Sequence, residues 1–583
     1  MTQHLLLIHI GPMQVFIAAA RRTRDLWFGS WLMSELSKAA ARAVAAAAGE
    51  GALIFPASSL DDLQPGSDLS VANKIVALVE KPEDVAKKAE EAMRARLDEL
   101  AGIALDAAKG KLDTWDTAVA QIKDLPEFYY AAVPLPDEKD YPNVRKKAEA
   151  LLAARKNLRQ FQQPTWGNSH PKSSLDGSRE SVIPKNVSGD AQKMYKWYKA
   201  KAGEQLSGVD LLKRLGKRNE EADFESFPST SHMAAMPLRA KLANGDAKAK
   251  AAWDAYMATL DDELKQTETV SGAPHPVFGN ADGALLFESR LRDFYGKSVP
   301  DNVTNALQAF YDAADKPIPY YALLVGDGDF MGQTIDNQET REAHRAFSAA
   351  LAEFANKAKE IVSNHGGAPV FTGGDDVLAL LPLHTAIQCA AELAETFQKT
   401  MKETVKSGHP PTFSAGIAIF HHTEPLEDAL QTAREAEQTA KSVKGKNALA
   451  VTEAKRSGAP RTVKGKWGTV NKRLLHLAAL FQAGALPSGL AYQLRDMYLH
   501  LGGQEAMPDL QGVLAAEAGR IIKRKEGAAK ELTEKAQAYI KDEMVVKLDD
   551  SYTIEQIAHE LIIAANLAKA AEQAGVDLAK ERG

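Results

Sequence analysis

The sequence contains almost no cysteine: its 583 residues include a single one, Cys389. One cysteine cannot form an intramolecular disulfide, and it cannot supply the several thiolates of a cysteine-based zinc site. Both kinds of covalent or metal cross-link are therefore excluded, and the composition fits a reducing compartment. Cys389 lies in an apolar stretch, residues 386–394, and is expected in a packed core.

Long hydrophobic runs and an excess of positive charge are also lacking. The apolar stretch Leu5–Ile10 is too short for a membrane span or a secretory signal, so we expect a cytoplasmic protein without a membrane partner. The net charge is −6, so no overall positive field attracts nucleic acid. Contact with RNA therefore needs local basic patches or partner subunits.

The length exceeds what one hydrophobic core supports, so several domains are expected. We place an α/β domain at 1–150, a mostly helical domain at 151–315, a second α/β domain at 316–465 and a helical domain at 466–583. The stretch 161–190, rich in Pro, Ser, Gly and Asn, marks the first boundary. In the first domain we expect strands at 5–10 and 52–55, helices at 13–24 and 29–48, and a charged helical region at 81–160.

Residues 145–159 form a basic stretch with six Lys or Arg side chains: Arg145, Lys146, Lys147, Arg155, Lys156 and Arg159. Such a stretch can contact a nucleic-acid backbone. The solvated face of a helix is the plainer interpretation, and we favour it. Contact with nucleic acid is the alternative.

The clearest pattern covers residues 318–452. It predicts strands at 318–325, 368–372, 377–381, 412–420 and 447–452, and helices at 338–363, 385–405 and 425–442. The order is βαββαβαβ, with a hairpin at its centre formed by the turn Gly373–Asp376. This order predicts an α+β fold with a ferredoxin-like palm.

Two pairs of carboxylates follow strands that are neighbours in this palm. Asp327 and Asp329 stand at the exit of the first strand, and Asp375 and Asp376 stand at the tip of the hairpin. Clustered carboxylates repel each other unless a cation neutralises them. Their hard oxygen ligands suit Mg²⁺ or Mn²⁺, and two such ions can activate a 3′-hydroxyl and stabilise a departing pyrophosphate. A polar turn with solvated aspartates is the plainer alternative.

Glycines and lysines accompany these aspartates. Gly328, Gly373 and Gly374 allow a phosphate or a base to approach the backbone. Lys441 and Lys446, at the end of the last palm helix, can reach a triphosphate as point charges. Lysines at a helix end also complement the helix dipole without binding any ligand, so both interpretations of them stand.

Several of these motifs resemble known families. The Gly-Gly-Asp-Asp hairpin, the Asp-Gly-Asp strand end and the segment from Ser414 to Ala418 are similar to the palm of nucleotide and diguanylate cyclases. The segments Ile10–Arg21 and Thr23–Trp27, with Gly29-Ser30, resemble the start of the large polymerase/cyclase subunit of type III-B CRISPR effector complexes. Residues 227–231 and 287–291 resemble its middle region.

This resemblance implies two ferredoxin-like palms, the first degenerate, with helical middle and C-terminal domains. It implies partner subunits of a type III complex, a guide RNA, and a target RNA that switches on an antiviral palm. The palm would join ATP through 3′–5′ bonds into cyclic oligoadenylate and release pyrophosphate. Catalysis and metal binding would fall to Asp327, Asp375 and Asp376, with Asp329 as a further metal ligand. Nucleotide contacts would come from Gly328, Gly373, Gly374, Ser414, Lys441 and Lys446.

The sequence departs from the family pattern in two ways. No His is followed directly by Asp, so the histidine–aspartate nuclease domain, and with it DNA cleavage, is not expected. The four-cysteine zinc element of many members is absent as well. Three alternatives stay open: transfer to another acceptor such as S-adenosylmethionine, a non-catalytic scaffold, and a stand-alone diguanylate cyclase. Val377 disfavours the last, because those enzymes place phenylalanine after the acidic residue.

Overall fold

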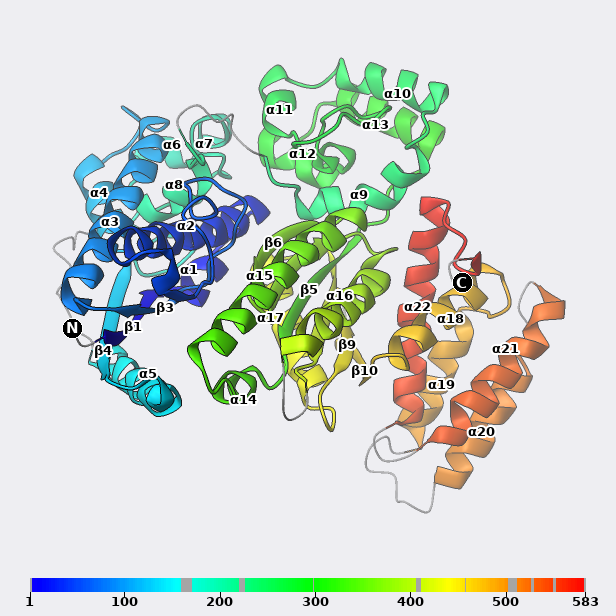
Figure 1. The fold of residues 1–583 in the computed structure, drawn as a ribbon. Coiled ribbons are helices and arrows are strands. Elements are labelled where there is room, and N and C mark those ends of the chain that lie inside the picture. The colour runs from blue at the N-terminus through cyan, green and yellow to red at the C-terminus, as the bar shows by residue number, and fades with distance from the viewer. Residues whose placement is uncertain are drawn as a thin grey trace.

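The structure is a computed structural model that describes residues 3–158, 170–219, 226–296, 298–404, 410–456, 458–501, 511–525, 529–548 and 552–580. It has the predicted α+β fold, with two separate β-sheets. Figure 1 shows the first sheet at the left, the second in the centre and the C-terminal helices at the right. Among the described residues, no helix has both the length and the apolar character that crossing a bilayer requires.

The first sheet has four strands in the order β2-β3-β1-β4. They are β1 (Gln3–Gly11), β2 (Leu53–Phe55), β3 (Lys74–Val79) and β4 (Glu127–Leu135). Neighbouring strands are antiparallel. Helix α2 (Thr23–Ala48) follows β1, and α3 (Pro82–Asp106) follows β3. This order and connectivity are those of a ferredoxin-like fold.

Strand β1 is buried on both faces over residues 5–8, which explains the unbroken apolar run there. Leu6 and Ile8 belong to the core that includes α2 and α3. Leu5 and Leu7 point to the other face, where they pack with α5 (Tyr141–Asn157). Successive side chains of a strand alternate between the two faces, so helices on both sides require apolar residues at every position.

Two elements of this half differ from the sequence-based expectation. The region 81–160 is not helical throughout, because it contains β4, whose Phe128, Tyr129 and Tyr130 favour a strand. The two helices expected at 13–24 and 29–48 are a short α1 (Gln14–Ala18) and a continuous α2 that runs through Gly29. A Cβ at Gly29 would lie 3.1 Å from Cδ of Lys213, so this glycine permits close packing rather than a helix start.

The second sheet has six strands in the order β10-β9-β8-β5-β7-β6. They are β5 (Tyr320–Gly328), β6 (Ala368–Gly373), β7 (Asp376–Leu381), β8 (Phe413–His421), β9 (Ala448–Glu453) and β10 (Arg461–Lys466). The helices between them are α14 (Met331–Asp336), α15 (Arg341–Asn364), α16 (Ala386–Met401) and α17 (Leu426–Lys441). The predicted order βαββαβαβ is confirmed. Helix α14 and strand β10 are additions that the sequence pattern did not predict.

Helices cover both faces of the second sheet. Ala322 and Leu324 of β5 pack with Leu351 of α15 in one core. Leu323, between them, points to the opposite face, where it shares a core with Leu430 of α17. Helices α15 and α16 thus lie on one side of the sheet and α17 on the other, which brings the last turn of α17 to the edge where β5 ends.

The remaining elements are mostly helical. Before the second sheet they are α4 (Trp115–Lys123), α6 (Lys185–Ser188), α7 (Ala191–Tyr198), α8 (Gly208–Leu215), α9 (Thr230–Lys241), α10 (Ala247–Met257), α11 (Asp262–Thr267), α12 (Glu288–Tyr295) and α13 (Asp301–Ala314). After it they are α18 (Val470–Gln482), α19 (Gly489–His500), α20 (Gln511–Lys523), α21 (Lys530–Glu543) and α22 (Ile554–Ala574). Short 3₁₀ turns lie at Glu50–Ala52, Glu138–Asp140, Gly283–Leu286, Lys402–Thr404 and Val545–Lys547.

The two sheet domains contact each other directly. One guanidinium nitrogen of Arg345, on α15, donates to the carbonyl oxygen of Leu53 on β2 at 2.9 Å. The backbone N–H of Ala57 donates to Oγ of Ser348 at 3.0 Å. These contacts join α15 to the end of β2, so the first palm lies against this helix of the second palm.

Candidate active site

The hairpin between β6 and β7 turns through two residues, Gly374 and Asp375, and closes on the paired Gly373 and Asp376. Gly374 has φ +65°, a conformation that glycine adopts readily and L side chains rarely do. Two-residue hairpin loops favour such conformations because they match the twist of the strands. The glycines expected to let a ligand approach the backbone therefore have a first role in shaping the turn.

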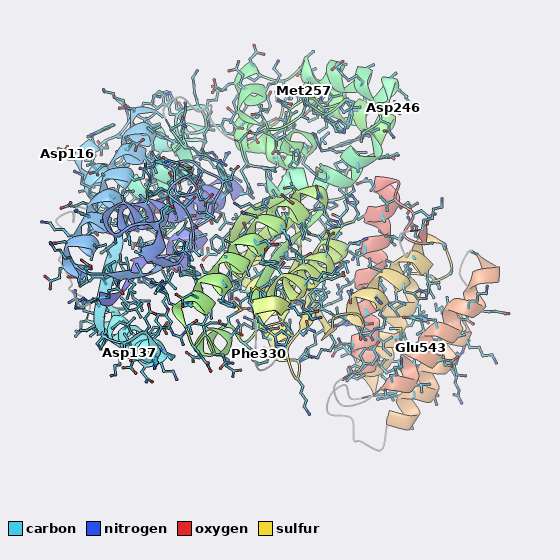
Figure 2. The ribbon with its side chains drawn as sticks, viewed as in Figure 1. Asp116, Asp137, Asp246, Met257, Phe330 and Glu543 are labelled. Carbon is cyan, nitrogen blue, oxygen red and sulfur yellow. The ribbon has the colours of Figure 1, made fainter. Side chains whose placement is uncertain are left out.

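Strand β5 brings the first acidic cluster to this turn. The antiparallel register of β5 and β7 sets Asp327 beside Asp376, one position beyond the last paired residues. A Cβ at Gly328 would lie 2.8 Å from Cβ of Asp375, so Asp375 lies directly against this glycine. Asp327, Asp375 and Asp376 therefore meet at one end of the sheet; Figure 2 labels Phe330 at this end.

Asp329 is fully buried and serves the fold of the site. Its Oδ2 accepts hydrogen bonds from Thr412 Oγ1 at 2.7 Å, from Ser414 Oγ at 2.8 Å and from the backbone N–H of Asn447 at 2.9 Å. These contacts tie the starts of β8 and β9 to the end of β5. Its Oδ1 is buried and has no hydrogen-bond partner among the described residues, which leaves one oxygen for a cation.

Ser414 does not lie where the sequence analysis expected it. We expected a nucleotide contact, but its side chain is buried and donates its hydroxyl to Asp329. Ser414 stands opposite Asp327 in the ladder between β5 and β8. In this structure it supports the acidic cluster from within the fold and does not offer its hydroxyl to a ligand.

Helix α17 supplies a lysine and a glutamate to the cluster. The ammonium group of Lys441 contacts Asp327 Oδ2, and it lies 2.8 Å from Oε1 of Glu437. Helix α17 can approach this closely because Gly416 of β8 has no side chain: a Cβ there would lie 2.1 Å from the backbone nitrogen of Glu437. The sequence analysis predicted Lys441 but missed Glu437, although their spacing of four residues places them on one helix face.

Lys446 contacts an aromatic ring of the site. It follows the end of α17 with a positive φ of 47°, and its ammonium group sits 4.6 Å from the ring centroid of Phe330. Its backbone carbonyl accepts a hydrogen bond from Lys466 on β10. The structure thus places Lys446 at the same end of the sheet as Asp327 while its charge rests on an aromatic ring.

The carboxylates of the cluster are held in an unfavourable electrostatic environment. Removal from water raises the pKa of Asp375, and the neighbouring Asp376 raises it further. Removal from water also raises the pKa of Glu437 to about 7, and Asp376 and Asp329 add to this effect. Removal from water lowers the pKa of Lys441 to about 8. A bound cation would relieve the repulsion among the carboxylates, because it favours their charged form.

The donor set fits a hard divalent cation in its chemistry. Aspartate oxygens are the ligands that Mg²⁺ and Mn²⁺ prefer, and the unpaired Oδ1 of Asp329 adds another. In the part of the chain that the structure describes, however, no three His, Cys, Asp or Glu side chains lie close enough together to hold one ion. The ammonium group of Lys441 contacts Asp327 at the position where a cation bound to that carboxylate would compete with it.

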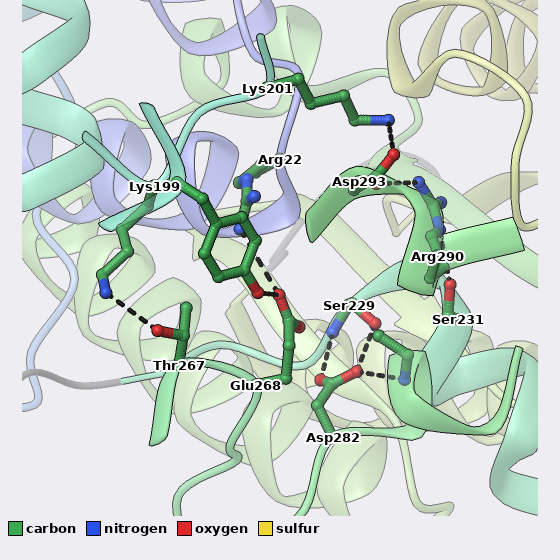
Figure 3. Close-up of polar contacts among 12 residues, drawn as sticks. Arg22, Lys199, Lys201, Ser229, Ser231, Thr267, Glu268, Asp282, Arg290 and Asp293 are labelled. Atoms are coloured by element: carbon green, nitrogen blue, oxygen red, sulfur yellow. Dashed lines mark hydrogen bonds and ion pairs between the residues drawn. The ribbon is translucent and has the colours of Figure 1, made fainter. Parts of the chain in front are cut away.

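A cavity of about 550 Å³ lies at the other end of α17. Its wall includes the start of α2, residues near α7 and α12, and the loop before Leu426. Figure 3 shows how its charged groups pair with one another: Arg22 lies 3.8 Å from Glu268, and Lys201 lies 2.9 Å from Asp293. The first pair links the residue before α2 to the residue after α11, and the second links the segment after α7 to α12, so these pairs hold separate parts of the chain together.

Comparison with known proteins follows the same division of the chain. Residues 320–450 match the family model described as Cas10/Cmr2, second palm domain, and residues 5–102 match CRISPR-associated protein Cmr2, N-terminal. The CRISPR system Cmr subunit Cmr2 of Pyrococcus furiosus is 35% identical over 183 residues. That alignment covers 27% of this chain and 21% of the relative, so the likeness in sequence spans about a fifth of the relative's length.

Solved structures show the same fold over nearly the whole chain. A chain of the type III-B Cmr-beta complex in its apo state superposes with a TM-score of 0.61 at 13% identity, covering 98% of this chain and 82% of its own. A chain of Cmr-beta bound to cognate target RNA gives the same TM-score and identity, covering 97% and 83%. Such low identity shows the fold alone. The two sequence matches go further: residues 5–102 are similar to the N-terminal domain of Cmr2, and residues 320–450 are similar to the second palm of Cas10/Cmr2.

Proposed function

We propose that this chain is the large subunit of an RNA-guided type III CRISPR complex and that its second palm is a nucleotidyltransferase. In this proposal the palm converts ATP into cyclic oligoadenylate with 3′–5′ bonds, releases pyrophosphate, and is switched on by a target RNA paired to a guide RNA. The matched Cmr2 domains and the fold shared with chains of the Cmr-beta complex support these partners. The proposed cofactor is a pair of divalent ions, either Mg²⁺ or Mn²⁺.

One observation carries the catalytic part of the proposal. Asp327 at the end of β5 and the turn bearing Asp375 and Asp376 meet at one end of the sheet, and α17 brings Lys441 to the same place. Carboxylates beside a lysine form a site in which metal-bound phosphates can be neutralised from two sides. A solvated polar turn would need neither the close contact at Gly328 nor the approach of α17.

The chemistry is the transfer of an adenylyl group. A 3′-oxygen attacks the α-phosphorus of a second ATP. The new oxygen–phosphorus bond forms as the bond from that phosphorus to the α–β bridging oxygen breaks, pyrophosphate leaves, and the 3′-hydroxyl proton passes to water. Divalent cations would lower the charge on the attacking and leaving oxygens. Asp327, Asp375, Asp376 and Oδ1 of Asp329 would hold them. Lys441 would neutralise the triphosphate, and Gly328, Gly373 and Gly374 would leave the backbone open to it.

Two related functions remain as alternatives. The same acidic cluster suits transfer of the adenylyl group to another acceptor, such as S-adenosylmethionine, because the residues that hold the α-phosphate do not specify the nucleophile. A non-catalytic scaffold is favoured by one observation: Lys441 pairs with Asp327 in this structure. A subunit that never releases this pair would bind RNA and partner subunits without turnover.

The test is product analysis on the assembled complex. We would incubate it with matched target RNA, Mn²⁺ or Mg²⁺ and labelled ATP, and identify products by mass spectrometry. Cyclic oligoadenylates that disappear in the Asp375→Ala, Asp376→Ala variant would support the proposal. A conjugate formed only when S-adenosylmethionine is added would favour the other acceptor. No product under either condition, from a complex that still binds target RNA, would favour the scaffold.

A further inference from the structure

One ammonium group in the site has two carboxylate partners. Lys441 contacts Asp327 on β5 and lies 2.8 Å from Glu437, one turn earlier on its own helix. The side chain of Lys441 is 18% exposed, that of Asp327 28% and that of Glu437 6%. Glu437 is therefore the inner partner of the lysine, and Asp327 is the partner that faces the open side of the site.

The backbone around Glu437 cannot move easily. Its nitrogen lies so close to Gly416 that a Cβ there would come within 2.1 Å, and Ala433 and Ala436 of the same helix lie against this glycine as well. A helix packed at backbone contact on a central strand is fixed in position. The backbone that carries Glu437 is therefore fixed, and its carboxylate stands four residues from Lys441 on one helix face.

We propose that Glu437 is a positioning residue that retains Lys441 in the site when Asp327 exchanges its ammonium partner for a divalent cation. The inference rests on the proposed function, because it needs Asp327 to be a metal ligand. Lys441 would then have two positions: between both carboxylates in the metal-free chain, and on Glu437 alone when Asp327 is occupied. In the second position the ammonium stays within reach of a triphosphate.

Lys441 and a divalent cation compete for the carboxylate of Asp327. A lysine held by Asp327 alone opposes a cation at that carboxylate, because the two positive charges repel each other and compete for the same oxygens. A second carboxylate on the far side of the ammonium lowers the cost of leaving Asp327. Replacing Glu437 by glutamine removes that charge and keeps the shape, so Lys441 should hold Asp327 more firmly and the chain should need more metal.

The experiment measures Mn²⁺ binding by the full-length chain without nucleotide, by calorimetry or by the electron paramagnetic resonance signal of free Mn²⁺. We expect Glu437→Gln to raise the dissociation constant for Mn²⁺ about three- to tenfold, and Lys441→Met to lower it. In the Lys441→Met background, Glu437→Gln should have little effect, because the residue acts through the lysine. Glu435→Gln, which removes the same charge from an exposed position on α17, is the control.

The outcomes separate this inference from the proposed function. An equal effect of Glu437→Gln with and without Lys441 would show a through-space charge effect and overturn the positioning role alone. Failure of the wild-type chain to bind Mn²⁺, or binding unchanged by Asp375→Ala, Asp376→Ala, would overturn the metal site and this inference with it. Unchanged thermal unfolding of the variants would show that folding is intact. In the active complex, Glu437→Gln should raise KM for ATP several-fold while kcat at saturating metal changes little.

Discussion

Among single residues, Gly328 determines how closely Asp375 approaches the end of β5. A Cβ at this position would lie 2.8 Å both from Cβ of Asp375 and from the side chain of Met331. Gly328→Ala should therefore displace the turn and weaken Mn²⁺ binding by about tenfold or more, since a ligand displaced by 1 Å loses most of its contact. Gly332→Ala is the matched control, because nothing lies within 4 Å of a Cβ there. Equal Mn²⁺ affinity in the two variants would mean that Asp375 is not a ligand.

The titration of residues in the acidic cluster predicts that Mn²⁺ affinity depends on pH. Glu437, with a pKa of about 7, and Asp375, whose pKa is raised, carry protons in slightly acidic solution that must leave before a cation binds. Lys441, with a pKa of about 8, loses its charge as the pH rises and then competes less for Asp327. Both effects have the same sign, so Mn²⁺ affinity should increase from about pH 6 to about pH 8. Calorimetry in two buffers of different ionisation enthalpy should detect proton release, and its absence would contradict this account.

The sequence predicted the residues of the site better than their contacts. Asp327, Asp375, Asp376 and Lys441 stand in short motifs whose strand and helix contexts can be read from the sequence, and the structure brings them together. Glu437 escaped notice because its role depends on a backbone contact between two elements, which no local pattern encodes. The position of Ser414 escaped notice for the same reason: its burial follows from the pairing of β8 with β5 and β9.

At the scale of elements, the position of α17 on the sheet decides whether Lys441 reaches Asp327. Gly416→Ala would place a methyl group 2.1 Å from the backbone nitrogen of Glu437, and only a shift of the whole helix can relieve that contact. We expect a destabilisation of about 1–3 kcal/mol and loss of most activity. Gly102→Ala, in α3, is the control, and we expect it to change stability in the opposite direction. A Cβ there meets nothing within 4 Å, and alanine favours a helix more than glycine does, so the variant should be more stable by about 0.5–1 kcal/mol. Chemical denaturation of both variants measures this difference.

The elements that the sequence failed to predict are those with the least local signal. Strand β10, with three basic residues in six and a glycine, pairs only with β9 and lies at the edge of the sheet. Strand β4 lies in a region whose average composition is charged and helical. The hairpin and the long amphipathic helices around it were predictable because their periodicity is strong over many residues. An edge strand owes its conformation to its neighbour, and only the folded chain shows that.

At the scale of the whole molecule, the first palm contacts the segment that follows the acidic strand end. Arg145 of α5 is fully buried; it donates to the carbonyl oxygen of Ile335 at 2.6 Å and to Oδ1 of Asp336 at 3.2 Å. Nearby, Tyr141 of the same helix lies 2.7 Å from Nδ1 of His344 on α15. The basic stretch at 145–159 therefore has one member that joins the two palms; Arg159 lies outside the described residues.

This contact predicts that Arg145 affects the acidic cluster from a distance, whereas its exposed neighbour Lys146 does not. Arg145→Ala removes charged hydrogen bonds to α14, the helix just beyond Asp329 and Phe330, so we expect a loss of about 1.5–3 kcal/mol in stability and weaker Mn²⁺ binding. Lys146→Ala should leave both unchanged, because its side chain faces solvent.

Adding RNA binding to the measurement separates the two interpretations of the basic stretch. An RNA-binding face would make Lys146→Ala reduce affinity for guide or target RNA, with a smaller dependence on salt, while Arg145→Ala would act through stability. A loss of RNA affinity in Arg145→Ala alone, at unchanged stability and Mn²⁺ binding, would contradict the structural role of this residue.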